Sequence, residues 1–513
     1  MSEQNKSLAK TALMITLIAA GSKVLGFVRE MVIAFVYGAG AVTDAFTIAV
    51  GVVTTANLLV STYLTTTFVP AHARIREHQG DATSILFTNT NLWLAILVNT
   101  FLLIVLQGAA PFMSKWIAPG FGADQTLIVI SALRISLFQL PFLVAIALFS
   151  GFLTARKSFY GPNLIGVPLS IVVSTTCLIL GMRRGVEGLA LANLFGVVSQ
   201  LLILLFWLPR EKYRVMLSFR IMPEVKEGVT LLLPALIGSA VIELNLWVDR
   251  VLASGLPEGS VASINFATRL IGLVQGLLIV PIAGIVFSVI SEHAAKKETK
   301  EMLEAFWHWV RIVLFFVIPI VAIAIPASSD IVRIVYERGE FDAVATRSTS
   351  SAFVWYLPSL LSAVFYIYLI RFYYALRDTK TPMFCGAISI SVNIVLSIIL
   401  VRIMGIAGLA LSTSVGSMLS AFLLLVFLRR KIGPLGFFST AKSLLVMMMC
   451  AVVSLLCVLG VMYFFAAQNV LLRFAVCTLV GGSAYLALAI VSKIAVAEEA
   501  LRFIRQKVFG RGS

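Results

Sequence analysis

The chain has 513 residues, of which 60% are hydrophobic and only 12% are charged. Soluble domains carry roughly 25% charged residues, so this composition excludes an ordinary soluble protein. Open sheets cannot satisfy their backbone polar groups in lipid, and the long apolar runs therefore predict an all-α polytopic membrane protein. The five cysteines lie inside apolar runs without a CxxC pair, which argues against a disulfide framework or a zinc site.

The apolar runs predict about fourteen transmembrane helices, because a bilayer core takes about 20 apolar residues per helix. The first run continues past Lys23 and Arg29 without a clean signal-peptide cleavage site, so we expect it to be a retained span. The predicted spans cover residues 11–37, 45–69, 84–110, 127–154, 161–181, 187–208, 228–252, 266–290, 307–328, 348–375, 383–401, 406–428, 443–465 and 474–492.

The formal net charge is +16, and most of the Lys and Arg residues lie in the loops between these spans. If the N-terminus is inside, the cytoplasmic segments hold far more Lys and Arg than the external loops, as the positive-inside rule requires. We therefore expect both termini in the cytoplasm. This placement of charge also argues against a nucleic-acid partner.

An internal duplication recurs at one constant offset: GVEGLALAN from Gly185 matches GIAGLALST from Gly405, and TARKSFYGP from Thr154 matches YALRDTKTP from Tyr374. Each copy holds six predicted spans, so both copies enter the membrane in the same orientation, as two parallel six-helix lobes. We expect an N-lobe over residues 1–220 and a C-lobe over residues 221–435. Two C-terminal helices and a cytoplasmic tail follow over residues 436–513.

The first predicted span carries charge at membrane depth, where ionisable residues are a functional hypothesis by default. Lys23, Arg29 and Glu30 share a helical stripe with Gly26, because their spacings match helical turns. The stripe therefore offers two cations and one anion. Asp44 follows at the start of the second span.

The second lobe brings charge to corresponding elements, with Asp249 and Arg250 in the seventh span and Arg269 in the eighth. Two cationic sites, one in each lobe, would suit a polyanionic headgroup such as a pyrophosphate. Alternatively, Arg29 pairs with Glu30 or Asp44, and Asp249 pairs with Arg250 or Arg269, merely to hold helices together. Arg134 in the fourth span is expected to line the same cleft or to snorkel.

No phosphate-binding loop, zinc motif or nucleophile elbow is present in the sequence, so we assign no catalytic residues. A membrane glycan polymerase or acyltransferase is a remote alternative. The acidic residues of the external loop 330–342 would then have to act, but that loop resembles a solvated amphipathic connector.

Several segments together resemble the MurJ (MviN) family of lipid II flippases, within the multidrug/oligosaccharidyl-lipid/polysaccharide exporter superfamily. They are GSKVLGFVREMVIAFVYGAGAVTDAF, TTTFVPAHARIRE, APGF, NLWVDRVLASGLPEGSVASINFATRL and YALRDTKTP. The resemblance implies a transporter of the bacterial inner membrane that flips an undecaprenyl-pyrophosphate-linked peptidoglycan precursor, lipid II, by alternating access. A flippase for another undecaprenyl-linked polysaccharide unit is the alternative.

The resemblance also implies roles for individual residues. Arg29 and Arg269 match cationic residues of the family, and Lys23 stands where members usually carry an arginine. Asp44 matches an acidic residue, and Asn57 falls where an arginine is often found. The expected headgroup-binding residues are therefore Lys23, Arg29, Glu30, Asp44, Asn57, Arg134, Arg250 and Arg269.

Sodium-binding relatives imply a coupling ion in the second lobe. The candidate ligands here are Asp249, Asn393, Ser397 and Thr413, with Ser397 in the place of a usual acidic ligand. No other cofactor is expected. The expected partners are lipid II, membrane lipids and the cell-wall synthesis machinery, with the chain acting as a monomer.

Overall fold

The computed structural model describes residues 3–220, 222–225 and 243–499. Within these ranges the chain forms helices and no strand, which confirms the predicted all-α fold. The chain divides into two compact units. The first comprises Met1–Asn265 with Arg338–Ala345, and the second comprises Phe266–Glu337 with Thr346–Ser513.

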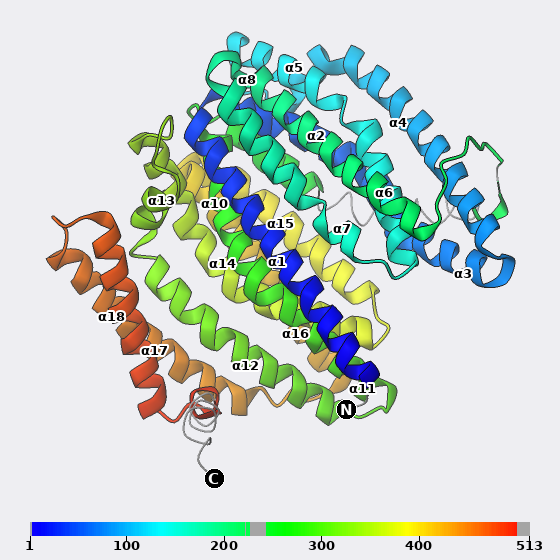
Figure 1. The fold of residues 1–513 in the computed structure, drawn as a ribbon. Helices are drawn as coiled ribbons and strands as arrows, with labels where there is room; N and C mark the ends of the chain where they lie inside the picture. The colour runs from blue at the N-terminus through cyan, green and yellow to red at the C-terminus, as the bar shows by residue number, and fades with distance from the viewer. Residues whose placement is uncertain (1–2, 221, 226–242, 500–513) are drawn as a thin grey trace. The chain divides into compact units, whose positions relative to one another are not determined.

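The first unit is built from long helices that pack side by side (Figure 1). Helix α1 packs along α8, α2 packs against α5, and α4 packs against α6. Helical residues 243–254 also belong to this unit. Its helices are α1 (Glu3–Tyr37), α2 (Ala41–Tyr63), α3 (Val69–Gln79), α4 (Asp81–Ile117), α5 (Ala123–Leu137), α6 (Leu140–Ala155), α7 (Tyr160–Leu164) and α8 (Gly166–Trp207), with the π-helix η1 (Leu64–Phe68) and the 3-10 helix η2 (Leu208–Glu211).

The second unit contains the remaining helices, two of which, α10 and α14, begin among residues of the first unit. Helix α15 packs along α16, α17 packs along α18, and α12 contacts α11, α17 and α18. These helices are α10 (Ser260–Val274), α11 (Val280–Ala295), α12 (Thr299–Ala324), α13 (Ser328–Tyr336), α14 (Ala343–Ala375), α15 (Lys380–Met404), α16 (Ile406–Ile432), α17 (Phe437–Phe464) and α18 (Val470–Val491), with the π-helix η3 (Gln275–Ile279).

Twelve of the predicted spans have a counterpart in the structure. Among the described residues, 11 helices are long and apolar enough to cross a membrane, and the pair Ala123–Leu137 and Leu140–Ala155, bent by 42°, makes up to 12. The predicted span 11–37 lies in α1, but its first side chains are not described, and residues 228–242 of the predicted span 228–252 lie outside the described residues. The count of fourteen therefore stays a prediction.

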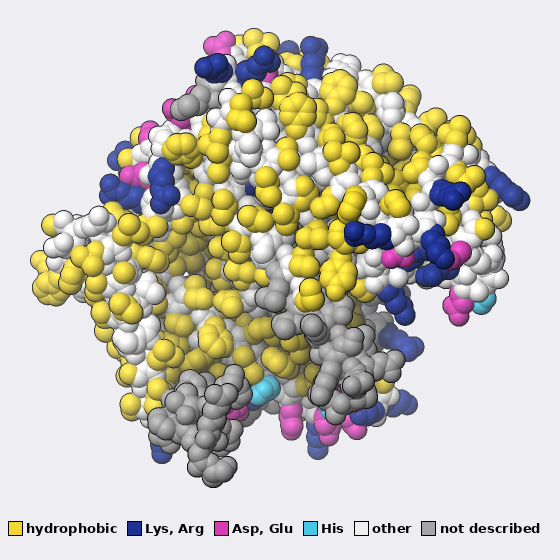
Figure 2. Space-filling model, viewed as in Figure 1, with side chains coloured by type: hydrophobic (Ala, Val, Ile, Leu, Met, Phe, Trp, Pro, Cys, Tyr) yellow, Lys and Arg dark blue, Asp and Glu magenta, His cyan; other side chains and the backbone are white. Residues whose placement is uncertain are grey.

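The surface of the helices separates apolar from charged side chains. In Figure 2 hydrophobic side chains cover the flanks of α4 and α8 in the first unit, and Lys and Arg gather near their ends. Large apolar side chains such as Phe101 and Ile104 on α4 are more than half exposed. Water would penalise such a surface, whereas lipid would not.

The backbone repeats itself at the same constant offset that the sequence predicts. Lys157 and Arg377 are non-glycine residues with positive φ angles of 63° and 57°. Gly185 and Gly405 share an unusual conformation, with φ/ψ of 51°/−133° and 58°/−130°. Positive φ is uncommon away from glycine, so its recurrence at matching positions supports the duplication.

The compact units do not follow the boundaries predicted for the lobes. Residues 243–265 and 338–345 belong to the second predicted lobe by sequence, yet they group with the first unit. Part of this grouping comes from the hydrogen bonds of Asp44 and from the close backbone approaches at Gly38 and Gly259, which are described below. The lobe boundaries themselves stay a prediction.

The glycines at the duplicated helix–helix turn give a matched pair of variants. A Cβ added at Gly408 would lie 2.2 Å from the Leu400 carbonyl oxygen, whereas one at Gly188 would lie 3.5 Å from the equivalent oxygen of Leu180 and 3.1 Å from the Tyr37 hydroxyl. We expect Gly408→Ala to destabilise the protein by about 1–3 kcal/mol through overpacking. Gly188→Ala should cost much less, because a tyrosine hydroxyl can move.

Thermal unfolding of the two purified variants in the same detergent measures this difference. A melting temperature for Gly408→Ala equal to or above that of Gly188→Ala would contradict the expected collision with the backbone.

Candidate functional site

The charged stripe of α1 is present in the structure. Arg29 donates a hydrogen bond from Nη2 to Oε1 of Glu30 over 2.7 Å, and their side chains are 18% and 8% exposed. Lys23 lies exposed two turns earlier on the helix. The pairing expected from the sequence between Arg29 and Glu30 is thus realised. A single carboxylate engages one end of the guanidinium, so the stripe keeps a net positive charge.

Asp44 caps a helix that starts in the second half of the duplicated sequence. Its Oδ2 accepts the N–H of Gly259 over 2.7 Å, and its Oδ1 accepts the N–H of Ala262 over 2.6 Å. These are donors at the start of α10, where backbone N–H groups have no partner within the helix. The carboxylate of Asp44, which is 1% exposed, supplies that partner. It also lies at the positive end of the helix dipole.

Glu258 makes the reciprocal contact. Its Oε1 accepts the N–H of Ala41 over 2.9 Å, at the first residue of α2. The starts of α2 and α10 therefore each receive a carboxylate from the segment that leads to or begins the other helix. We call this arrangement the paired cap and define it by Asp44, Glu258 and the three N–H groups that they accept.

Glycines bring backbones into contact around the paired cap. Gly259 has φ +85°, and a Cβ built on it would lie 2.1 Å from the carbonyl oxygen of Ala39. Gly38 has φ +63°, and its Cβ would lie 2.3 Å from the carbonyl oxygen of Glu340. Glu340 in turn donates its N–H to the carbonyl oxygen of Phe35 over 3.0 Å. This end of the first unit is consequently packed backbone against backbone, which only glycine allows.

A second polar group joins α2 to helical residues 243–254. Thr55 donates its hydroxyl to Oε2 of Glu243 over 3.0 Å and accepts the indole N–H of Trp247 over 2.8 Å. The guanidinium of Arg250 lies 4.9 Å from the centre of the Trp247 ring. Its Nη1 would lie 2.5 Å from a Cβ at Gly51, so the glycine makes room for it on α2. The sequence analysis predicted Arg250 as a headgroup-binding residue but did not predict its close approach to Gly51.

Asn57 carries an unusual acceptor. Its Oδ1 is buried and has no hydrogen-bond partner among the described residues. Buried polar atoms are nearly always paired, and each exception calls for an explanation. A hydroxyl or amide of a bound molecule would provide the missing donor.

The remaining predicted residues differ in exposure and in the unit to which they belong. Arg134 is exposed in the last turn of α5, and its side chain has no ion pair among the described residues. Arg269 is exposed on α10 and belongs to the second unit. Asp249, which is 9% exposed, belongs to the first unit.

Two of the predicted sodium ligands, Asn393 and Ser397, lie in a buried cluster of oxygens in the second unit. The hydroxyls of Ser397 and Ser412 lie 2.7 Å apart, and Ser397 lies 3.4 Å from Oδ1 of Asn393. The hydroxyl of Thr413 instead donates to the carbonyl of Leu409 in its own helix. Ser412 is therefore the residue of α16 that meets Ser397. Neutral oxygens of this kind are the donors that hard cations take in proteins.

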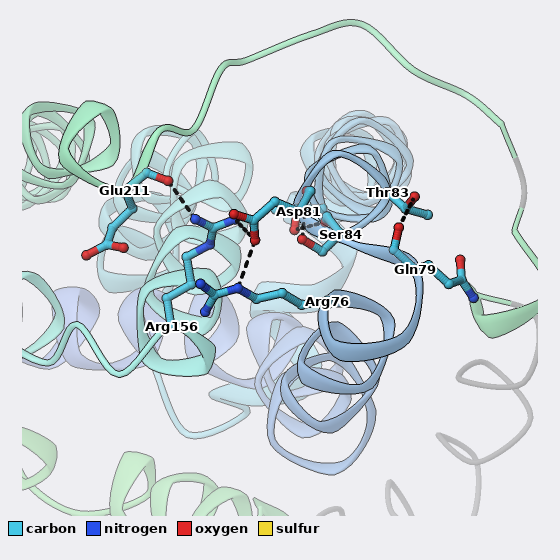
Figure 3. A network of polar contacts seen from close by, with 8 residues as sticks. Arg76, Gln79, Asp81, Thr83, Ser84, Arg156 and Glu211 are labelled. Carbon is cyan, nitrogen blue, oxygen red and sulfur yellow. Dashed lines mark hydrogen bonds and ion pairs between the residues drawn. The ribbon is translucent and has the colours of Figure 1, made fainter.

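Sequence reasoning missed a charge network at the helix ends of the first unit (Figure 3). Asp81 accepts from Arg76 over 2.8 Å and from Arg156 over 3.1 Å, and Arg156 also donates to the Glu211 carbonyl over 2.8 Å. The side chain of Arg156 is 4% exposed and stacks on Phe152, with 4.8 Å between the guanidinium carbon and the ring centre. The network ties together the ends of α3, α4, α6 and α8.

The second unit has a related tie at the matching positions of the repeat. Lys431, which is the counterpart of Glu211 in the second copy, contacts Oδ2 of Asp378 over 2.5 Å. Burial raises the pKa of Asp378, but the hydrogen bonds from Lys431 and Thr381 outweigh it and lower the pKa to about 2. The carboxyl therefore stays ionised at neutral pH. In both units the turn after the fourth span of the repeat is tied to the end of the sixth.

Comparison with known proteins places this geometry in a family. The family model described as lipid II flippase MurJ matches residues 33–485. A probable lipid II flippase MurJ of Rhizobium tropici is 28% identical over 437 residues, covering 83% of this chain and 81% of the relative. The lipid II flippase MurJ of Burkholderia cenocepacia is 28% identical over 428 residues, covering 80% of this chain and 81% of the relative.

Solved structures share the fold. A lipid II flippase MurJ in an inward closed conformation aligns with a TM-score of 0.79 at 20% identity, covering 97% of this chain and 100% of the other. An inward-facing multidrug resistance transporter of the MATE family and MOP superfamily aligns with a TM-score of 0.63 at 17% identity, covering 82% and 95%.

Removing the carboxylate of the paired cap should weaken the first unit. Asp44→Ala leaves two buried N–H groups without an acceptor, at a cost of roughly 1–3 kcal/mol for each donor. Asp44→Asn keeps one acceptor oxygen and should fall between the alanine variant and the wild type. Thermal unfolding compares both with Asp124→Ala, a change of the same type at an exposed position. Equal melting temperatures for Asp44→Ala and Asp124→Ala would contradict the capping role.

Proposed function

Because this chain belongs to the lipid II flippase MurJ family, we propose that it moves lipid II from the cytoplasmic to the outer face of the inner membrane by alternating access. The match over residues 33–485 is the observation that carries this proposal. The chain is a multi-pass membrane transporter and not an enzyme. It holds the headgroup in a polar cleft while the lipid tail stays in the bilayer.

The chemistry of α1 supports an anionic cargo. Lys23 is exposed, and Arg29 shares only part of its guanidinium with Glu30. The pyrophosphate of lipid II takes the remaining donors of Arg29, because a guanidinium binds phosphate oxygens in pairs. The unpartnered Oδ1 of Asn57 accepts from a hydroxyl or amide of the sugar–peptide part. Arg250 and Arg269, both within the predicted C-lobe, contribute further cations.

The paired cap supports a rigid outer end of the first unit. Asp44 and Glu258 join the starts of α2 and α10 at the end that the loop charges assign to the outside. Each charge carried through 100 mV of membrane potential is worth about 2.3 kcal/mol, which can bias the cycle.

The central test is complementation of cells depleted of their own lipid II flippase, with lipid II exposure at the outer face as the second readout. Arg29→Ala and Arg269→Ala should abolish flipping, and Arg→Lys should impair it because an ammonium lacks the paired donors. Lys23→Arg should be tolerated. Correct insertion without growth or exposure would reject lipid II in favour of another undecaprenyl-linked unit.

The ion pair on α1 requires its own control. Arg29→Ala alone strands the buried carboxylate of Glu30, which can destabilise the protein by about 3–5 kcal/mol. The double variant Arg29→Ala, Glu30→Gln removes both charges and leaves no stranded carboxylate. It should fold as well as the wild type and still fail to flip. Full activity in this double variant would show that Arg29 serves only to neutralise Glu30.

Both termini lie in the cytoplasm in this proposal, and single cysteines test that orientation. In a background without the five native cysteines, Cys at Asp124 or Gln468 should react with an impermeant thiol reagent added to intact cells. Cys at Glu77 or Thr299 should react only after the cells are opened. All four positions are exposed in the structure, so access to the reagent depends on the side of the membrane. Labelling of Glu77→Cys in intact cells would reverse the orientation.

A sodium ion couples transport through the oxygens of Asn393, Ser397 and Ser412, which lie together in the second unit. Sodium should then raise the melting temperature of the purified protein, by the mass-action effect of a ligand on the native state, and potassium should not. Ser397→Ala and Ser412→Ala should lose the sodium effect, whereas Thr413→Val should keep it. Equal stabilisation by both ions would remove sodium from the mechanism.

A further inference from the structure

The second unit contains a cavity away from the charged stripe of α1. It has a volume of about 860 Å³ and lies between the end of α11, the first half of α12 and the turn that leads into α17. Its charged and aromatic lining includes His293, Lys300, Glu304, His308, Trp309 and Arg311. All of these residues belong to the second unit.

The charges of the cavity are ordered along α12. Lys300, Glu304, His308 and Arg311 follow one another at spacings of four, four and three residues, so they share one face of the helix. Glu304 and its neighbour Glu301 lie in the first turns, and Arg311 lies about two turns further along, which is roughly 10 Å on the helix axis. The cavity thus has two carboxylates and the cation Lys300 near the start of the helix, and a cationic zone deeper in the span.

Arg311 has donors to offer in the deep zone. Its Nε donates to the carbonyl of Trp307 over 3.3 Å, and its outer nitrogens make no hydrogen bond to the described residues. Arginine in a membrane span normally pairs with an anion or reaches water. Its planar guanidinium matches two oxygens of one phosphate.

The walls of the cavity fit a lipid at the membrane surface. The indole of Trp307 donates to the Leu435 carbonyl over 2.6 Å and so holds the turn before α17 in place. Trp309 is half-buried beside it. Tryptophan favours the level of lipid headgroups because one end of its ring system is polar and the rest is apolar. Basic pockets between membrane helices on the cytoplasmic side bind the phosphate-bearing headgroups of cardiolipin and phosphoinositides.

We propose that this cavity binds the phosphoethanolamine headgroup of an aminophospholipid. The phosphate, which lies nearer the acyl chains, binds Arg311 with His308 beside it. The ammonium, which lies nearer the water, donates hydrogen bonds to Glu304 and Glu301. A choline headgroup has the same charges but no N–H donor, and a glycerol headgroup has no cation for the carboxylates. The order of charges in the cavity therefore selects the primary amine.

Native mass spectrometry of the full-length protein tests this site, with phosphatidylethanolamine, phosphatidylcholine and phosphatidylglycerol of identical chains supplied in detergent. The wild type should retain phosphatidylethanolamine several-fold better than phosphatidylcholine. Glu304→Gln should erase that preference but keep retention of phosphatidylglycerol. Arg311→Gln should lower retention of all three lipids. Arg74→Gln and Glu77→Gln, at exposed positions on α3 outside the cavity, should change nothing.

Two results would overturn the proposal. One is equal retention of the ethanolamine and choline lipids by the wild type. The other is wild-type retention in an Arg311→Gln variant with an unchanged melting temperature. Should Arg311→Gln fail to fold, Arg311→Lys keeps the charge but loses the paired donors, and undiminished retention there would equally overturn it. Lipid retention is measured without cargo, so its outcome is independent of the flipping assay.

Discussion

In hydrocarbon, every backbone N–H and C=O must find its partner within the chain, because no water is there to supply one. Continuous helices meet this requirement by themselves. Where a helix starts or breaks, some backbone groups lack a partner within the helix, and side chains or neighbouring backbone carbonyls supply it. Asp44 and Glu258 serve the starts of α10 and α2. At the break between α5 and α6, the N–H groups of Phe138 and Gln139 donate to the backbone carbonyls of Ile135 and Ser136.

The same constraint governs charges. Arg29 has Glu30 beside it, and Arg473 forks onto both oxygens of Asp330 while also donating to the Ala466 carbonyl over 3.0 Å. Asp330 lies on α13 and Arg473 in the first turn of α18, so this ion pair fixes the C-terminal helix pair at one end. Gly481 lets α18 lie close to α17 and α12 further along. In lipid, apolar surface provides no hydrophobic driving force for one helix to pack against another. Polar and small residues therefore position these helices.

The sequence predicted the helices that follow from the length of apolar runs. It did not predict hydrogen bonds between residues that are far apart along the chain. Apolar runs located twelve spans, and adjacency alone pointed to the pairing of Arg29 with Glu30. The bonds of Asp44 join residues 215 and 218 positions apart, and no local pattern announces them. Nor does a resemblance to a family fix the rotation of a helix: Thr413 was expected among the sodium ligands, but its neighbour Ser412 contacts Ser397. Adjacent residues point in directions about 100° apart around a helix. An error of one residue in the alignment therefore turns a different side chain toward the site.

The two copies of the duplicated turn no longer carry equal constraints. In the second copy the Leu400 carbonyl oxygen presses on Gly408, whereas in the first the equivalent oxygen stands away from Gly188 and a tyrosine from α1 fills the space. Copies of a duplicated segment begin with identical tolerance to change. Here a backbone atom, which no substitution removes, leaves no room for a Cβ in one copy, whereas in the other copy the nearest atom belongs to a side chain. Position 188 can therefore accept a small side chain where position 408 cannot, so the two copies of one ancestral turn differ in how much sequence change each tolerates.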